Sequence, residues 1–294
     1  MTQTTDLVLT LVSRDGDASL LAKRAPGATG SVSDRSGAQW SVVERSVVGS
    51  AELVRWLDAE TPALGADWAI TTVGNRRKRL LISDMDSTII GQECLDELAD
   101  FAGLKAEVSA ITERAMRGEL DFAGALTQRV AMLKGLNLSA LEACHRERVR
   151  LNPGAIELVA TMKAHGARCV LVSGGFGYFT SRVAQMAGFD ADRANTLIDD
   201  GTALTGYVGM PILGREAKLA ALLEETAAFG GSADDAIAMG DGANDLDMIR
   251  AAGLGVAYKA KPIVAAETRA RIEHTDLRAA LFFQGYGVDE LVSV

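Results

Sequence analysis

The sequence has too few cysteines and histidines for several classes of site. Its three cysteines, Cys94, Cys144 and Cys169, are an odd number without close spacing, so neither a disulfide framework nor a thiolate metal site is indicated. The three histidines are not paired at helical spacing, which argues against a histidine metal site and a Ser-His-Asp triad. We expect a protein of a reducing compartment, the cytoplasm.

Long apolar runs and an excess of basic residues are also lacking. No stretch approaches the roughly 18 apolar residues of a membrane helix, and no basic residue precedes the short apolar run Leu7–Val12, unlike a secretory signal. The chain has 30 Lys and Arg against 39 Asp and Glu, a formal net charge of -9, which repels polyphosphate backbones and anionic lipids. We expect neither a nucleic-acid partner nor a membrane partner.

The composition is that of a globular protein. Hydrophobic residues make up 48% of the 294 residues and charged residues 23%. At roughly 100–200 residues per domain, this length predicts about two domains.

The first 75 residues predict a small α+β domain. Strand-like and helical patterns alternate, at 7–13, 18–25, 39–48, 51–59 and 67–73. A glycine, an asparagine and four consecutive basic residues follow at 74–79, which is typical of a solvated linker. We therefore place the domains at 1–78 and 79–294.

The second domain predicts a doubly wound α/β fold. Continuously apolar runs of this kind are typical of buried parallel strands. They lie at Leu80–Ser83, Cys169–Val172, Ala236–Met239 and Leu254–Ala257. Helical patterns alternate with them, at 155–164, 179–187, 216–228 and 245–252. Between about 91 and 150 only helical periodicity is found, which predicts a helical cap inserted after the first strand.

Polar residues follow three of the predicted strands. They are Asp84-Met85-Asp86-Ser87-Thr88, Ser173-Gly174-Gly175-Phe176-Gly177 and Gly240-Asp241-Gly242-Ala243-Asn244-Asp245. Ligands bind at the carboxyl ends of parallel strands, so these segments should converge. Gathering Asp84, Asp86 and Asp241 is unfavourable unless a cation or a proton neutralises them. An all-oxygen cluster of this kind suits Mg²⁺.

These segments, together with Lys218, resemble in order the four motifs of the haloacid dehalogenase superfamily of phosphatases. The cap segment 114–122, the following Arg129 and the Ser-Gly-Gly-Phe run are similar to the phosphoserine phosphatase members of that superfamily. The resemblance covers about residues 79 to 280. It implies a Rossmann-like core of that superfamily.

The resemblance also implies the reaction. Asp84 would be the nucleophile that forms an aspartyl-phosphate, and Asp86 the general acid and base. Mg²⁺ would be held by the Asp84 side chain, the Asp86 backbone carbonyl and Asp241, with Asp245 in support through water.

Phosphate and substrate contacts are implied in the same way. Lys218, the Ser173 hydroxyl and the Gly174 N–H would bind the phosphate, and Asn244 would orient either the phosphate or the lysine. From its pattern alone, Lys218 reads as a surface residue.

On the cap side, Glu93 and Arg129 match the residues that hold the amino and carboxylate groups of phosphoserine. Met116 and Phe122 would exclude water. From the sequence pattern alone, Arg129 could equally be a snorkelling side chain whose charge reaches water. Glu93 could equally be a favourable partner of the helix dipole.

The implied function is hydrolysis of O-phospho-L-serine to L-serine and phosphate, the last step of serine biosynthesis. Two alternatives stay open: a related enzyme that acts on another phosphomonoester or transfers the phosphoryl group to an acceptor such as homoserine, and an amino-acid-sensing protein with a vestigial catalytic domain. The N-terminal domain resembles ACT-like regulatory domains, and it reads equally well as a stability module or one that pairs two subunits in a homodimer.

Overall fold

The N-terminal part of the computed structural model is a four-stranded antiparallel sheet with two helices. The structure describes residues 7–14, 16–116 and 119–293. The elements here are β1 (Leu7–Ser13), α1 (Ser19–Arg24), β2 (Ala28–Asp34), β3 (Ser41–Val47), α2 (Ala51–Glu60) and β4 (Asp67–Thr72). The order of the strands is β2-β3-β1-β4. Strand β2 was not predicted, because its polar sequence is largely exposed at the edge of the sheet and carries no apolar alternation.

The second part alternates strands and helices, as predicted. Its strands are β5 (Leu80–Ser83), β6 (Arg168–Phe176), β7 (Ala191–Asn195), β10 (Ala236–Gly240), β11 (Leu254–Tyr258) and β12 (Ala270–Ile272). Its helices are α7 (Ala155–Ala164), α8 (Gly177–Ala187), α9 (Arg215–Ala228), α10 (Leu246–Ala251), α11 (Pro262–Ala265) and α12 (Ala279–Phe283). The six strands run parallel in the order β12-β11-β10-β5-β6-β7.

Both faces of the parallel sheet are buried, which explains its continuously apolar strands. Along β5, Leu81 belongs to one hydrophobic cluster, while Leu80 and Ile82 belong to another on the opposite face. Helices α7, α8 and α12 pack on the first face, and α9, α10 and α11 on the second. The sequence pattern therefore reflects a three-layer α/β/α core.

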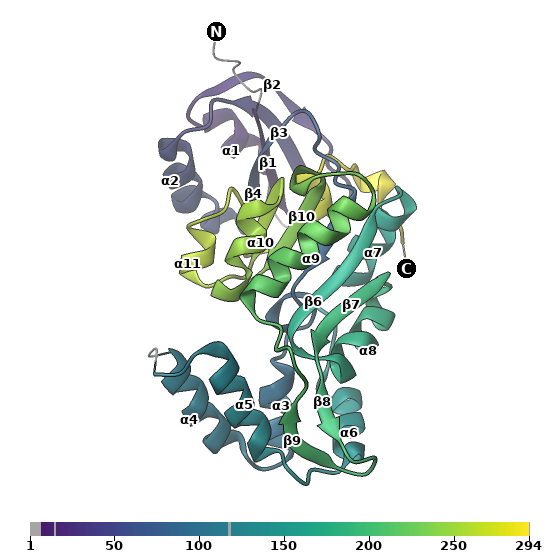
Figure 1. Ribbon diagram of the computed structural model, residues 1–294. Coiled ribbons are helices and arrows are strands. Elements are labelled where there is room, and N and C mark those ends of the chain that lie inside the picture. Colours follow the sequence, from purple (N-terminus) through teal and green to yellow (C-terminus); the bar gives the residue numbers. More distant parts are fainter. Residues whose placement is uncertain (1–6, 15, 117–118, 294) are drawn as a thin grey trace.

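The two sheets are continuous. Strand β4 pairs antiparallel with β12, so one ten-stranded sheet runs from β2 to β7 (Figure 1). The Asp67 carboxylate at the start of β4 is fully buried and accepts hydrogen bonds from the backbone N–H groups of residues 273–275 and from the Thr275 hydroxyl. These bonds tie the N-terminal sheet to the core.

The segment between β4 and β5 is only partly the solvated linker that was predicted: Arg77 and Arg79 are exposed, whereas Arg76 and Lys78 are largely buried. Arg76 is largely buried and forms an ion pair with Glu44 of β3 at 2.5 Å. Lys78 is 7% exposed, and its Nζ donates to the backbone carbonyls of Asn75 and Asp234, both at 2.7 Å. The charge of the segment suggested exposure to solvent, but Arg76 and Lys78 are buried against Glu44 and the Asp234 carbonyl of distant segments, and Lys78 also bonds to the nearby Asn75 carbonyl.

The predicted cap is a set of four helices at the opposite end of the core from the N-terminal sheet (Figure 1). They are α3 (Cys94–Phe101), α4 (Lys105–Met116), α5 (Phe122–Met132) and α6 (Leu138–Arg148). An unpredicted hairpin, β8 (Leu197–Asp199) and β9 (Leu204–Val208), supports them. It does so through the α5–α6 connection, because Gly135 N donates to Leu204 O at 2.8 Å and Leu204 N to Leu136 O at 2.9 Å.

No helix in the described part of the chain is long and apolar enough to cross a membrane.

Candidate active site

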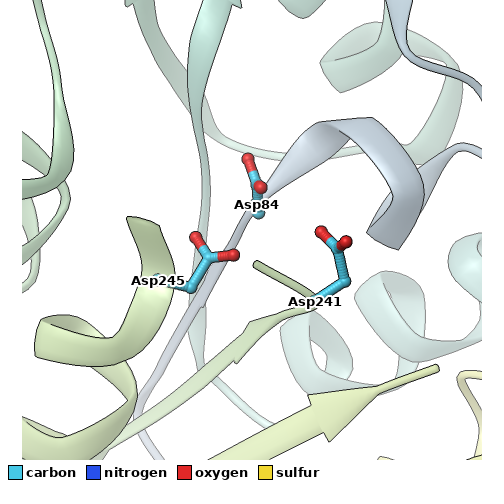
Figure 2. Close-up of side chains that lie close together, drawn as sticks. All are labelled: Asp84, Asp241 and Asp245. Carbon is cyan, nitrogen blue, oxygen red and sulfur yellow. The ribbon is translucent and has the colours of Figure 1, made fainter. Parts of the chain in front are cut away.

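Three aspartates meet at the carboxyl ends of the parallel strands. Asp84 directly follows β5, Asp241 follows β10, and Asp245 lies in the next turn (Figure 2). One carboxylate oxygen from each lies within 4.8 Å of the others. The sequence predicted that Asp84, Asp86 and Asp241 gather here; Asp84 and Asp241 do, but the third carboxylate of the cluster is Asp245 and not Asp86.

Lys218 reaches this cluster from the first turns of α9. Its Nζ lies 2.7 Å from Asp84 Oδ1 and 2.6 Å from Asp245 Oδ1, and its side chain is only 2% exposed. Asp84 Oδ1 also accepts from Met85 N at 2.8 Å, whereas its Oδ2 accepts no hydrogen bond from the described residues. Asp84 is thus held in place through Oδ1, and Oδ2 is free to contact a ligand.

Asp245 holds the lysine rather than facing the pocket. Its second oxygen, Oδ2, accepts from Gly242 N at 3.1 Å, and the residue is completely buried. The prediction left open whether Asn244 orients the phosphate or the lysine. Asn244 lines the pocket, and it is Asp245 that bonds to Lys218.

Burial and mutual repulsion shift the titration of the cluster. Desolvation, then the neighbouring Asp245, raise the pKa of Asp84 well above its usual range, although Lys218 opposes the shift. Desolvation with Asp245 and Glu93 raises the pKa of Asp241 to about 6. Burial lowers the pKa of Lys218, but the two carboxylates outweigh it, and the net pKa is raised. The lysine therefore stays charged at neutral pH.

Asp86 has a different environment from Asp84, two residues earlier. Its Oδ1 accepts from the backbone N–H of Cys94, at the start of cap helix α3, at 3.3 Å. Desolvation and the charge of Glu93 raise the pKa of the Asp86 carboxyl to about 7. Two carboxylates in one loop thus differ in charge partners, which suits different chemical roles.

The donor set fits Mg²⁺. Asp84, Asp241 and Asp245 supply only oxygen atoms, and hard divalent cations prefer such ligands. One lysine ammonium does not balance the three clustered carboxylates, so a divalent cation would relieve the remaining repulsion.

The Ser173–Gly175 segment lies at the end of β6, beside the aspartates. Ser173 is 2% exposed, and its Oγ accepts from Gly175 N at 2.9 Å, so its hydroxyl hydrogen remains available for a ligand. A Cβ built on Gly174 would lie 3.1 Å from Cζ of Phe122. This close approach of the cap explains a glycine at position 174.

Cap and core enclose a cavity of about 150 Å³. It is lined by Asp84, Asp86, Glu93, Leu95, Phe122, Leu126, Arg129, Ser173, Gly174, Gly175, Phe176, Asp241, Gly242, Asn244 and Lys261. Glu93 accepts from the Ser87 hydroxyl at 2.7 Å. Arg129 uses Nε to donate to Ala125 O at 3.3 Å, and no other hydrogen bond of its guanidinium is found among the described residues.

Lys218 and Asp245, both predicted as site residues, do not line this cavity, and the side chain of Met116 cannot be placed relative to it. Lys218 lies behind Asp84, as described above. Met116 ends α4, and its side chain lies outside the described residues.

Leu95 of α3 and Lys261 line the cavity but were missed, and the Lys261 backbone N–H donates to Asp241 O at 3.0 Å. Lys261 follows β11, so applying the strand-end rule to the fourth apolar run would have found it.

The fold and this site define a class of hydrolases, and the sequence comparison agrees. The haloacid dehalogenase-like hydrolase family model matches residues 81–250, and the chain belongs to that family. A phosphoserine phosphatase from Polaromonas sp. is 51% identical over 191 residues, which are 63% of this chain and 81% of the relative.

Two solved structures resemble nearly the whole chain. A probable phosphoserine phosphatase from Vibrio cholerae is 30% identical with a TM-score of 0.77, and the match covers 96% of this chain and 88% of that one. A haloacid dehalogenase (HAD) family hydrolase from Salmonella enterica serovar Typhi is 29% identical with a TM-score of 0.86, and the match covers 94% of this chain and 98% of that one. Such coverage includes most of the N-terminal sheet, so its arrangement against the core recurs in both proteins.

Proposed function

We propose that the chain is a magnesium-dependent phosphatase that hydrolyses O-phospho-L-serine to L-serine and phosphate through an aspartyl-phosphate. One observation carries the proposal. The lysine-held Asp84 and the separately placed Asp86 line a small cavity that Glu93 and Arg129 also line. These groups complement, in turn, a phosphate ester, an ammonium group and a carboxylate. The names of the relatives support the same substrate.

In the first step, an Asp84 oxygen attacks phosphorus, and the bond between phosphorus and the seryl oxygen breaks. Asp86 gives its proton to that oxygen, and L-serine leaves. Lys218 opposes the rise in the pKa of Asp84 and so favours the ionised form that attacks, and it offsets the charge of the approaching phosphate. The Ser173 hydroxyl and the Gly174 N–H donate hydrogen bonds to phosphate oxygens, and Asn244 orients the phosphate.

In the second step, water attacks the phosphorus of the aspartyl-phosphate. Asp86, now ionised, accepts a proton from this water, and the bond between phosphorus and Asp84 breaks to release phosphate. Asp86 thereby returns to its protonated form. A pKa of about 7 for this carboxyl suits a group that acts as acid and then as base near neutral pH.

Mg²⁺ would be held by the Asp84 side chain, the Asp86 backbone carbonyl and Asp241, where it supplies positive charge to the phosphate oxygens. Asp245 is placed to support the site while it holds Lys218. Phe122 of the cap shields the short serine stem from water.

Steady-state kinetics with Mg²⁺ test the proposal. Phosphoserine should have a higher kcat/KM than phosphoethanolamine or ethyl phosphate, which lack the carboxylate. No preference for phosphoserine would reject the substrate assignment. Product analysis with added homoserine separates hydrolysis from transfer: a phosphohomoserine product would favour the transferase alternative.

For the rest of the chain, we propose two domains, 1–78 and 79–294, of which the first is an ACT-like module that also pairs subunits in a homodimer. Its βαββαβ order supports an ACT-like arrangement. We also propose that the enzyme works in the cytoplasm, consistent with three buried free cysteines.

A further inference from the structure

Asn195, at the carboxyl end of β7, has a buried amide with a complete set of partners. The residue is 2% exposed. Its Nδ2 donates to Gly174 O at 2.8 Å and to Leu213 O at 3.1 Å, and its Oδ1 accepts from Leu213 N at 2.7 Å. Both amide hydrogens are used, so the orientation of the amide is fixed by its partners.

The two bonds to Leu213 anchor the amide. Leu213 precedes α9, the helix that carries Lys218. Because Leu213 occupies Oδ1 and one hydrogen of Nδ2, the other hydrogen must point at Gly174. A side chain held in this way can orient a second group precisely enough to matter for a reaction.

The bond to Gly174 reaches the Ser173 hydroxyl through one peptide group. The Gly174 carbonyl and the Gly175 N–H belong to the same planar peptide. Asn195 Nδ2 donates to the oxygen of this peptide, and the N–H of the same peptide, that of Gly175, donates to Ser173 Oγ at 2.9 Å. Occupying a lone pair of Oγ from one side directs the hydroxyl hydrogen elsewhere.

We propose that Asn195 is a positioning residue for phosphate binding: it fixes the Gly174–Gly175 peptide so that the Ser173 hydroxyl is aimed as a donor at the phosphate. The inference rests on the proposed function for the placement of a phosphate group at Ser173. It gives a role to a residue outside the four motifs.

A double-mutant cycle tests this role in the full chain with Mg²⁺. The variants are Asn195→Ala, Ser173→Ala and the pair, with Asn195→Asp as a second variant that keeps the size and the acceptor for Leu213 N–H but loses both donors. The readouts are the Kd for inorganic phosphate and kcat/KM for phosphoserine. Thr226→Val is the matched control, because Thr226 is also 2% exposed and, among the described residues, its hydroxyl bonds only within α9, to Leu222 O and Leu223 O.

Asn195→Ala and Asn195→Asp should each weaken phosphate binding and kcat/KM by about tenfold, and in the Ser173→Ala background Asn195→Ala should add no more than about twofold. Thr226→Val should change neither readout. The inference is overturned if Asn195→Ala has the same effect in both backgrounds, or if Asn195→Asp behaves as wild type. The Kd for inorganic phosphate can be measured whether or not the protein hydrolyses phosphoserine. If Asn195 and Ser173 are coupled in phosphate binding but phosphoserine is not hydrolysed, the proposed function is rejected and the role of Asn195 stands.

Discussion

Lys218 Nζ and Asp84 Oδ1 lie 2.7 Å apart in the buried end of the site, although the two residues belong to different elements, α9 and the end of β5. The same ammonium group bonds to Asp245. Charge neutralisation of the proposed nucleophile therefore depends on this lysine.

Lys218→Met should abolish most of the activity and destabilise the fold. Removing the ammonium leaves two buried carboxylates without their partner, at a cost of about 3–5 kcal/mol in the free energy of unfolding. We expect kcat to fall by at least about 10²-fold. Lys163→Met is the control, because Lys163 pairs with Asp190 at the surface, and its loss should cost less than about 1 kcal/mol. Wild-type kcat in Lys218→Met would contradict the assigned role.

Stability without metal should rise as the pH falls. The pKa values of Asp84, Asp86 and Asp241 are raised in the folded protein, so the folded state binds protons that the unfolded state does not. The free energy of unfolding of the metal-free protein should therefore increase from about pH 8 to about pH 6. Mg²⁺ should remove this trend, because the metal neutralises the same carboxylates.

Thermal unfolding with EDTA and with Mg²⁺ across this pH range checks the effect, and Asp241→Asn should flatten the metal-free curve. Magnesium binding should also release protons, measurable by calorimetry in buffers of different ionisation enthalpy. Identical pH dependence with and without Mg²⁺ would count against a metal at these carboxylates.

Arg129→Ala should impair phosphoserine far more than substrates without a carboxylate. Losing a charge-assisted, bidentate contact predicts a rise in KM of about 10²-fold for phosphoserine and little change for phosphoethanolamine. Arg146→Ala is the control, since Arg146 is exposed on cap helix α6 and pairs with Glu147. Equal effects of Arg129→Ala on both substrates would mean that the arginine does not read the carboxylate.

Asp67→Ala should destabilise the protein at the contact between the N-terminal sheet and the core. It leaves the buried N–H and hydroxyl of Thr275 and the partly buried N–H groups of Glu273 and His274 without their partner, which predicts a loss of about 3 kcal/mol. Asp58 makes an ion pair with Arg271 at the same junction but is 40% exposed, so Asp58→Ala should lower the melting temperature much less. Similar losses from the two variants would show that Asp67 is not the main tie.

The predictable parts of the fold are those whose side chains are buried. Strands β5, β6, β10 and β11 have apolar sequences because helices cover both sheet faces. Strands β2 and β7 were missed because polar residues dominate them. The β8–β9 hairpin was missed because its strands are short and mostly not buried, so backbone pairing rather than apolar burial defines it. The β4–β12 pairing involves two distant segments, and no local pattern specifies it.

The site follows the same rule. Asp84, Ser173 and Asp241 could be found because each directly follows an apolar run of the sequence, although β6 extends beyond Ser173. Asn195 also ends a strand, but the polar sequence of β7 hid that strand. The paired state of Lys218 depends on α9 packing beside β5, so its sequence pattern alone suggested a surface residue.

The central claim is that phosphoserine is hydrolysed through a phosphoryl group on Asp84. Acid quenching of a reaction with radiolabelled phosphoserine and Mg²⁺, followed by peptide mapping, tests it most directly. The account predicts a hydroxylamine-labile label on the peptide that contains Asp84, and its absence from Asp84→Asn, which should also form no L-serine. A label on another residue, or L-serine formation by Asp84→Asn at the wild-type rate, would contradict the account.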